Sequence, residues 1–120
     1  MWDGVDRRKF LRADYPCLIT MRKSTPPQEA ILTHTEDISI TGVRILAPKK
    51  LPMMAEIDLE LDLKDTLPTV ISRGMVKRVK EIAPSGQGKR VRYDIGIEFV
   101  GLSEVQRVRI KKIIERVKGG

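Results

Sequence analysis

Two groups of residues in this chain have side chains suited to binding a charged ligand. The first group is Arg7, Arg8 and Arg12, and the second, further along the chain, is Asp37, Ser39 and Gly42. A guanidinium is planar and always charged, so it can bind a phosphate bidentately and stack on a flat ring. Asp and Ser add directional hydrogen bonds, and glycine allows both a turn that other residues resist and the close approach of a ligand. Together they predict a site for an anionic, aromatic ligand such as a nucleotide.

Each group also has an ordinary explanation. Short basic segments are often solvated. Asp and Ser favour turns because their side chains bond nearby backbone N–H groups. The combination of the two groups in this order favours the ligand site.

In order and spacing, the two groups resemble the motifs RxxxR and DxSxxG of the PilZ domain family. Arg8 and Arg12 match the first motif, with Arg7 before them, and the second group matches DxSxxG. In that family the two motifs form the receptor site for the bacterial second messenger cyclic di-GMP. Residues 94–99, followed by a basic helix, also look like the end of such a domain. The resemblance covers about residues 6–117 and implies a six-stranded barrel with a C-terminal helix.

The resemblance implies further features of the ligand site. Arg78 occupies a strand position where some relatives carry a side chain that packs near the bound guanine. An arginine there could stack on the base or remain a solvated charge. In family terms, an arginine at position 7 is typical of domains that bind two intercalated ligand molecules. An extra cation would offset the repulsion among their phosphates, so we expect two cyclic di-GMP molecules per chain.

Length and composition fit a single cytoplasmic domain spanning residues 1–120. The single cysteine, Cys17, excludes an internal disulfide and fits a small core residue. His34, the single histidine, has no zinc-ligating partners at suitable spacing, so no metal or other cofactor is expected. No apolar run approaches the ~20 residues of a membrane helix.

Positive charge is concentrated near the two ends of the chain. The net charge is +7, with basic clusters in residues 7–12 and 107–118, which favours an anionic partner. Residues 1–12 lack a clear apolar pattern and predict a mobile arm that the ligand orders. The order–disorder step would signal to a separate, unidentified effector protein.

Alternating apolar residues predict a small antiparallel barrel. The expected strands cover residues 14–21, 29–38, 43–47, 57–63, 69–79 and 91–99. The alternation in 57–63 is strict, so one face should be buried and the other should carry solvated carboxylates.

The chain then changes to a helical period over residues 103–118. Ser103 and Gln106 form a capping box. The apolar stripe of this helix consists of Leu102, Gln106, Ile110, Ile113, Ile114 and Val117. The opposite face is basic; it is either solvated or a contact surface for nucleic acid, anionic lipid or an acidic protein.

Three other functions are alternatives to a receptor. A basic small barrel could bind nucleic acid, but such proteins display several aromatics for base stacking, and this chain has five in all. A protein-interaction adaptor with a vestigial ligand site is the other alternative, and the intact motifs argue against it. An enzyme is disfavoured because the sequence shows no nucleophile–base pair, metal cluster or phosphate-cradling loop.

Overall fold

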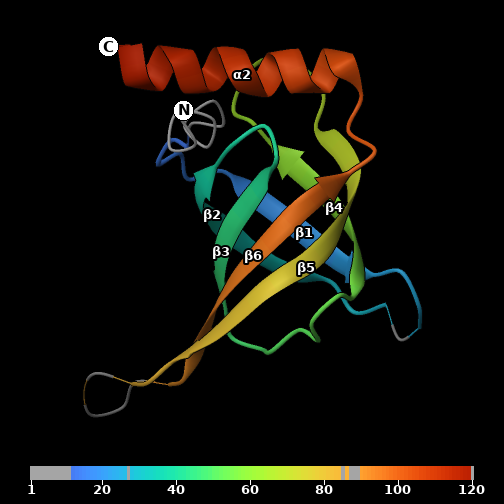
Figure 1. Ribbon diagram of the computed structural model, residues 1–120, viewed down its shortest axis with the longest axis vertical. Coiled ribbons are helices and arrows are strands. Elements are labelled where there is room, and N and C mark those ends of the chain that lie inside the picture. The colour runs from blue at the N-terminus through green and yellow to red at the C-terminus, as the bar shows by residue number, and fades with distance from the viewer. Residues whose placement is uncertain (1–11, 27, 85, 87–89, 120) are drawn as a thin grey trace, which may run out of the picture.

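The polypeptide forms six strands and one helix in a computed structural model that describes residues 12–26, 28–84, 86 and 90–119 (Figure 1). The elements are β1 (Leu18–Lys23), β2 (Ile31–Ile38), β3 (Gly42–Ala47), β4 (Glu56–Asp62), β5 (Val70–Ile82), β6 (Arg92–Val100) and α2 (Glu104–Gly119). The strands close into a barrel in the order β1-β2-β3-β6-β5-β4, with every neighbouring pair antiparallel. The expected barrel with a C-terminal helix is therefore confirmed.

Aliphatic side chains from alternate strand positions fill the barrel. In β4, Ile57, Leu59 and Leu61 are buried, and the residues between them are exposed, as the strict alternation predicted. Cys17 lies in the same core, where burial raises the pKa of its thiol. It is a small apolar core residue, as expected from the sequence.

Strand ends differ from the expected ones where backbone donors are missing or pairing continues. The first strand was expected over 14–21 but begins at Leu18, because Pro16 has no N–H to donate to a ladder. The Cys17 N–H next to it bonds the Thr35 side chain, at 3.0 Å from N to Oγ1. β5 continues to Ile82, past the expected residue 79, because its pairing with β6 extends that far.

A β-bulge in β2 interrupts the alternation of its side chains. Thr35 pairs with Ile45 and points into the barrel, whereas Asp37 pairs with Arg44 on the outer surface. Glu36 is the extra residue between them. Strict alternation would place Asp37 on the same face as Thr35, so the bulge brings its carboxylate to the outside.

A second bulge interrupts the alternation of side chains in β5. Val76 pairs with Ile97 in the core, and Arg78 pairs with Gly96 on the outer surface. Lys77 is the extra residue. The two bulges therefore place an acidic and a basic side chain on one outer wall.

The helix α2 lies across one end of the barrel (Figure 1) and buries Ile110, Ile113 and Ile114 against the core. Its capping box is confirmed: the Gln106 N–H donates to Ser103 Oγ at 3.1 Å, and the Ser103 N–H donates to Gln106 Oε1 at 3.2 Å. Val117 was expected on the buried stripe but is 44% exposed. The C-terminal end of α2 extends past the strands (Figure 1), so no strand of the described barrel lies beneath the stripe there. No helix in the described ranges is both long enough and apolar enough to cross a membrane.

Candidate functional site

An open cleft of about 390 Å³ lies on the outer wall of the barrel. It crosses β2, β3, β6 and β5, the strands that contain the two bulges. The cleft is lined by Arg12, Asp37, Thr41, Gly42, Arg44, Lys77, Arg78, Gly96, Ile97 and Glu98. Four of these residues are basic and two are acidic, so its side chains favour an anionic ligand.

The register of the four strands aligns the charged residues of the cleft. Asp37 pairs with Arg44, Arg44 with Gly96, and Gly96 with Arg78. These four residues form one row across the wall. Gly96 has no side chain, so it leaves a gap between the two arginines, and a Cβ at this position would fit there at 3.5 Å from Arg78 Cβ. The gap is the floor of the cleft.

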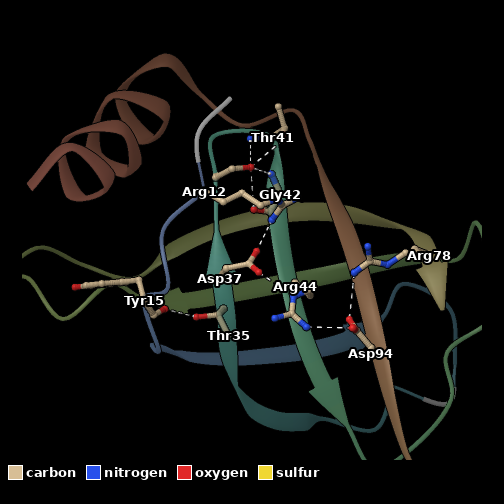
Figure 2. A network of polar contacts seen from close by, with 10 residues as sticks. Arg12, Tyr15, Thr35, Asp37, Thr41, Gly42, Arg44, Arg78 and Asp94 are labelled. Atoms are coloured by element: carbon tan, nitrogen blue, oxygen red, sulfur yellow. Dashed lines mark hydrogen bonds and ion pairs between the residues drawn. The ribbon is translucent and has the colours of Figure 1, made fainter. Parts of the chain in front are cut away.

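Ion pairs join the row into a continuous ladder (Figure 2). Arg12 Nη1 lies 2.5 Å from Asp37 Oδ1, and Asp37 Oδ2 lies 2.8 Å from Arg44 Nε. Asp94 then joins the two remaining arginines, with Oδ2 at 3.1 Å from Arg44 Nη1 and Oδ1 at 3.2 Å from Arg78 Nη2. Each carboxylate therefore holds two guanidinium groups in place (Figure 2).

Partial burial strengthens the central ion pairs. The side chain of Asp37 is 12% exposed, so its charge is screened less than that of a surface carboxylate. The hydrogen bond from Arg44 to Asp37 is the main cause that raises the pKa of Arg44. Arg44 is therefore a permanent cation at the centre of the cleft.

Backbone pairing fixes Arg12 beside Asp37. The next residue, Ala13, forms an isolated bridge with Ile38, and both of its N–H···O bonds measure 3.0 Å. Ala13 is buried in the core, whereas Arg12 is exposed. The bridge thus places the last arginine of the first motif next to the first residue of the second motif.

Ser39 supports the cleft from behind rather than lining it. Its side chain is buried, and its Oγ accepts hydrogen bonds from the N–H groups of Thr41 at 3.1 Å and Gly42 at 3.2 Å. These bonds fix the turn between β2 and β3. In this structure Ser39 shapes the turn that places Gly42 in the cleft.

Gly42 is needed for a different reason from the one expected. The sequence suggested a turn conformation that other residues resist, but among the described glycines only Gly101 has a positive φ. A Cβ on Gly42 would lie 2.1 Å from the carbonyl oxygen of Ile97. Glycine is therefore required because β3 and β6 approach closely here. Gly42 also lines the cleft, which agrees with the expected approach of a ligand.

The structure brings together four of the seven residues predicted for the site. Arg12, Asp37, Gly42 and Arg78 all line the cleft. Arg7 and Arg8 lie outside the described residues, as does nearly all of the predicted arm 1–12. Within the described part of the chain, no cluster of His, Cys, Asp or Glu could hold a metal ion, and His34 is exposed on β2.

Sequence reasoning missed Arg44, Lys77, Asp94 and Gly96. Asp94 and Gly96 occupy the outward positions of an alternating strand, and Arg44 follows Gly42 by two residues. The alternation could have assigned Asp94 and Gly96 to the outer surface. It could not have identified their neighbours, which depend on strand order and on the two bulges.

Comparisons with known proteins agree with this fold. The family model described as "PilZ domain" matches residues 6–116. A structure described as the PilZ domain with c-di-GMP of YcgR from Escherichia coli has a TM-score of 0.72 at 15% identity, covering 94% of this chain and 92% of that one.

Two longer proteins contain the same fold. The Bacillus subtilis inhibitor of motility MotI/DgrA has a TM-score of 0.73 at 14% identity, covering 93% of this chain and 51% of that one. The K. pneumonia MrkH–c-di-GMP complex has a TM-score of 0.72 at 21% identity, covering 94% and 53%. This chain thus spans about half of each. A search of curated proteins gave no significant match.

Proposed function

Because this chain belongs to the PilZ domain family, we propose that it is a receptor for cyclic di-GMP that binds the messenger without catalysing a reaction. The observation that carries this proposal is that Arg12, which belongs to the first motif, lines the same cleft as Asp37 and Gly42 of the second. Arg12 and Asp37 are far apart in sequence, yet they form an ion pair at its edge. Structures described as containing c-di-GMP, from YcgR and MrkH, have the same fold.

The chemistry of the cleft suits both parts of the ligand. An arginine fork can neutralise a phosphate or donate to O6 and N7 of guanine. A carboxylate can accept from guanine N–H groups, and each oxygen of Asp37 keeps acceptor capacity beyond its bond to an arginine. Arg78, at the far side of Gly96, is placed to stack on a base or to bind a phosphate. In this proposal Arg7 and Arg8 add further cations from the N-terminal side. Ser39 contributes indirectly, by fixing the turn that places Gly42 in the cleft.

Calorimetric titration with cyclic di-GMP tests the proposal, with GTP and single-stranded DNA as alternative ligands. Arg12→Ala should weaken binding by about 10- to 100-fold, because it loses a charge-assisted hydrogen bond of roughly 1.5–3 kcal/mol. The matched control is Arg22→Ala, since Arg22 lies on β1 and pairs with Glu60 at 3.1 Å, outside the cleft. The control should bind like the parent. Equal affinity of parent and Arg12→Ala would contradict the proposed site, and tighter binding of DNA would favour the nucleic-acid alternative.

We further propose that each chain binds two cyclic di-GMP molecules and that Arg7 favours the second one. The cleft extends from Arg12 past Arg44 to Arg78, which offers cations to more than two phosphates. The parent should saturate near two equivalents and Arg7→Leu near one. A parent that saturates at one equivalent would refute the stoichiometry and leave the receptor proposal intact.

The signal in this proposal passes from residues 1–12 to a separate effector protein. Trp2 is the only tryptophan in the chain, so its fluorescence reports directly on this segment. Ligand should change its emission and slow amide exchange in residues 5–12. If both stay unchanged at saturation, the signal does not travel through this segment.

A further inference from the structure

A second groove lies away from the cleft, between α2 and the loop that connects β4 to β5. Its volume is about 550 Å³. One wall is the loop at Asp65, Thr66 and Leu67, and the other is the side of α2 that begins at Glu104. None of the residues that line the cleft line this groove, so the proposed ligand site does not account for it.

Exposed apolar side chains line one half of the groove. Leu67 is 54% exposed, Val105 is 73% exposed and Val108 is 40% exposed. Val105 and Val108 are three residues apart on the helix, so they are neighbours on one side of it. Scattered exposed apolar residues need no explanation, but several in one concave surface are typical of an interaction site.

The other half of the groove is basic. Lys112 and Arg116 are exposed and continue the line of Val105 and Val108 at helical spacing. Glu104, in the first turn of α2, lines the opposite end. The groove is therefore apolar along its first turns and positively charged toward its C-terminal end.

An ion pair holds the two walls together. Arg109 Nη2 lies 2.9 Å from Asp65 Oδ1 and 3.2 Å from Asp65 Oδ2, and its side chain is largely buried. This contact ties the loop to the helix at the base of the groove. A preformed groove loses less conformational entropy on binding than one that must be ordered.

We propose that this groove binds an amphipathic helix of a partner protein that carries acidic residues at one end of its apolar face. The stripe from Val105 to Arg116 spans roughly 16 Å at 1.5 Å per residue, which matches about three helical turns of a ligand. Apolar residues of the ligand would cover Leu67, Val105 and Val108, and its carboxylates would meet Lys112 and Arg116. Glu104 repels a carboxylate at the other end, which fixes the direction of binding.

Other occupants fit the groove less well. A helix that lies on a lipid surface needs a broad apolar face with large side chains, whereas this side of α2 offers two valines beside a loop. Nucleic acid would leave the apolar half of the groove uncovered. Charge and apolar surface in one concave site favour a protein helix.

Two synthetic peptides test the proposal with the whole chain. One is a 16-residue amphipathic helix with leucines on one face and glutamates beside its C-terminal half, and its twin has lysines in place of the glutamates. Binding is followed by fluorescence anisotropy of labelled peptide and by amide shifts of the ¹⁵N-labelled protein. We expect saturable binding of the acidic peptide, with shifts concentrated at residues 65–67 and 104–116.

Charge reversals provide the matched comparison. The double variant Lys112→Glu, Arg116→Glu should weaken binding of the acidic peptide by at least about tenfold, because two attractive contacts become repulsive. The control Lys111→Glu, Lys118→Glu changes the same charge on the same helix outside the groove and should change affinity less than about twofold. Circular dichroism establishes that each variant is folded.

Several results would overturn the proposal. These are no saturable shifts at the groove up to millimolar peptide, equal binding of the lysine twin, or equal weakening by both double variants. Binding to phosphatidylglycerol vesicles that depends on Lys112 and Arg116, without peptide binding, would assign the groove to lipid. Self-association that Val105→Ser abolishes would assign it to a second copy of the chain. The experiment uses no cyclic di-GMP, so its failure leaves the receptor proposal untouched.

Discussion

Replacing Gly42 with alanine should destabilise the whole barrel, although the change adds a single methyl group. The added Cβ would lie 2.1 Å from the Ile97 carbonyl oxygen and 3.0 Å from its carbon. Both atoms are backbone, so no rotamer change can relieve the overlap. β3 must move away from β6 by roughly 1 Å to reach a tolerable contact.

The cost follows from the contacts that this movement breaks. The Phe99 N–H, on β6, donates to Thr41 O at 2.8 Å. Losing this bond costs about 0.5–1.5 kcal/mol, and the remaining overlap costs about 1–3 kcal/mol. The free energy of unfolding should fall by about 2–4 kcal/mol, which is a large part of the 5–15 kcal/mol typical of a domain.

Urea and thermal unfolding measure this loss, with Gly96→Ala as the comparison. A Cβ at Gly96 meets Arg78 Cβ at 3.5 Å, an ordinary contact, so its unfolding free energy should stay within about 0.5 kcal/mol of the parent. Gly42→Ala should lower the melting temperature by roughly 10 °C or more. Gly96→Ala should instead weaken cyclic di-GMP binding, because the methyl fills the cleft floor. A Gly42→Ala variant as stable as the parent would refute the close-approach argument.

Three further predictions concern single side chains. Arg44→Ala removes one ion-pair partner from both Asp37 and Asp94, so the affinity for cyclic di-GMP, measured by calorimetry, should fall about tenfold. An unchanged affinity would exclude Arg44 from the site. Ser103→Ala removes the cap on α2 and should cost about 1 kcal/mol in urea unfolding, whereas no loss would mean that the cap is dispensable. Because burial raises the pKa of Cys17 above its usual 9.0, the unfolded thiol loses its proton at a lower pH than the native thiol does. The free energy of unfolding should therefore decline as pH rises above about 9, and Cys17→Ala should remove that part of the decline. A variant whose stability falls with pH as steeply as the parent's would contradict a buried Cys17 thiol. Reaction of the native thiol with Ellman's reagent at the rate of the unfolded thiol would contradict it as well.

The sequence predicted the parts of the fold that depend on local patterns. The alternation around Leu59 and the capping box at Ser103 both correspond to what the structure shows. The helical stripe was correct for Ile110, Ile113 and Ile114, which pack in the core, and wrong for Val117, which is exposed near the C-terminal end of the helix. Periodicity identifies a face but not the extent of the surface that covers it.

The candidate site was predicted in part because its motif residues have characteristic spacing. Arg12, Asp37 and Gly42 could be identified in this way. Arg44 and Asp94 could not, because their roles come from pairing between strands that are distant in sequence. Asp37 was placed in the site by its motif, although a strict alternation from Thr35 would have turned it inward.

The two bulges give the pairing register of each strand a role equal to that of its side chains. If β2 kept Glu36 but paired without the bulge, Glu36 would lie opposite Arg44 and Asp37 would turn toward the barrel interior. Removing Glu36 would instead leave Asp37 directly after the inward-facing Thr35, so its carboxylate would still face the outer wall. Lys77 and Arg78 are related in the same way in β5. Whether a motif residue of a relative faces this wall therefore depends on how its strand pairs as well as on its place in the motif.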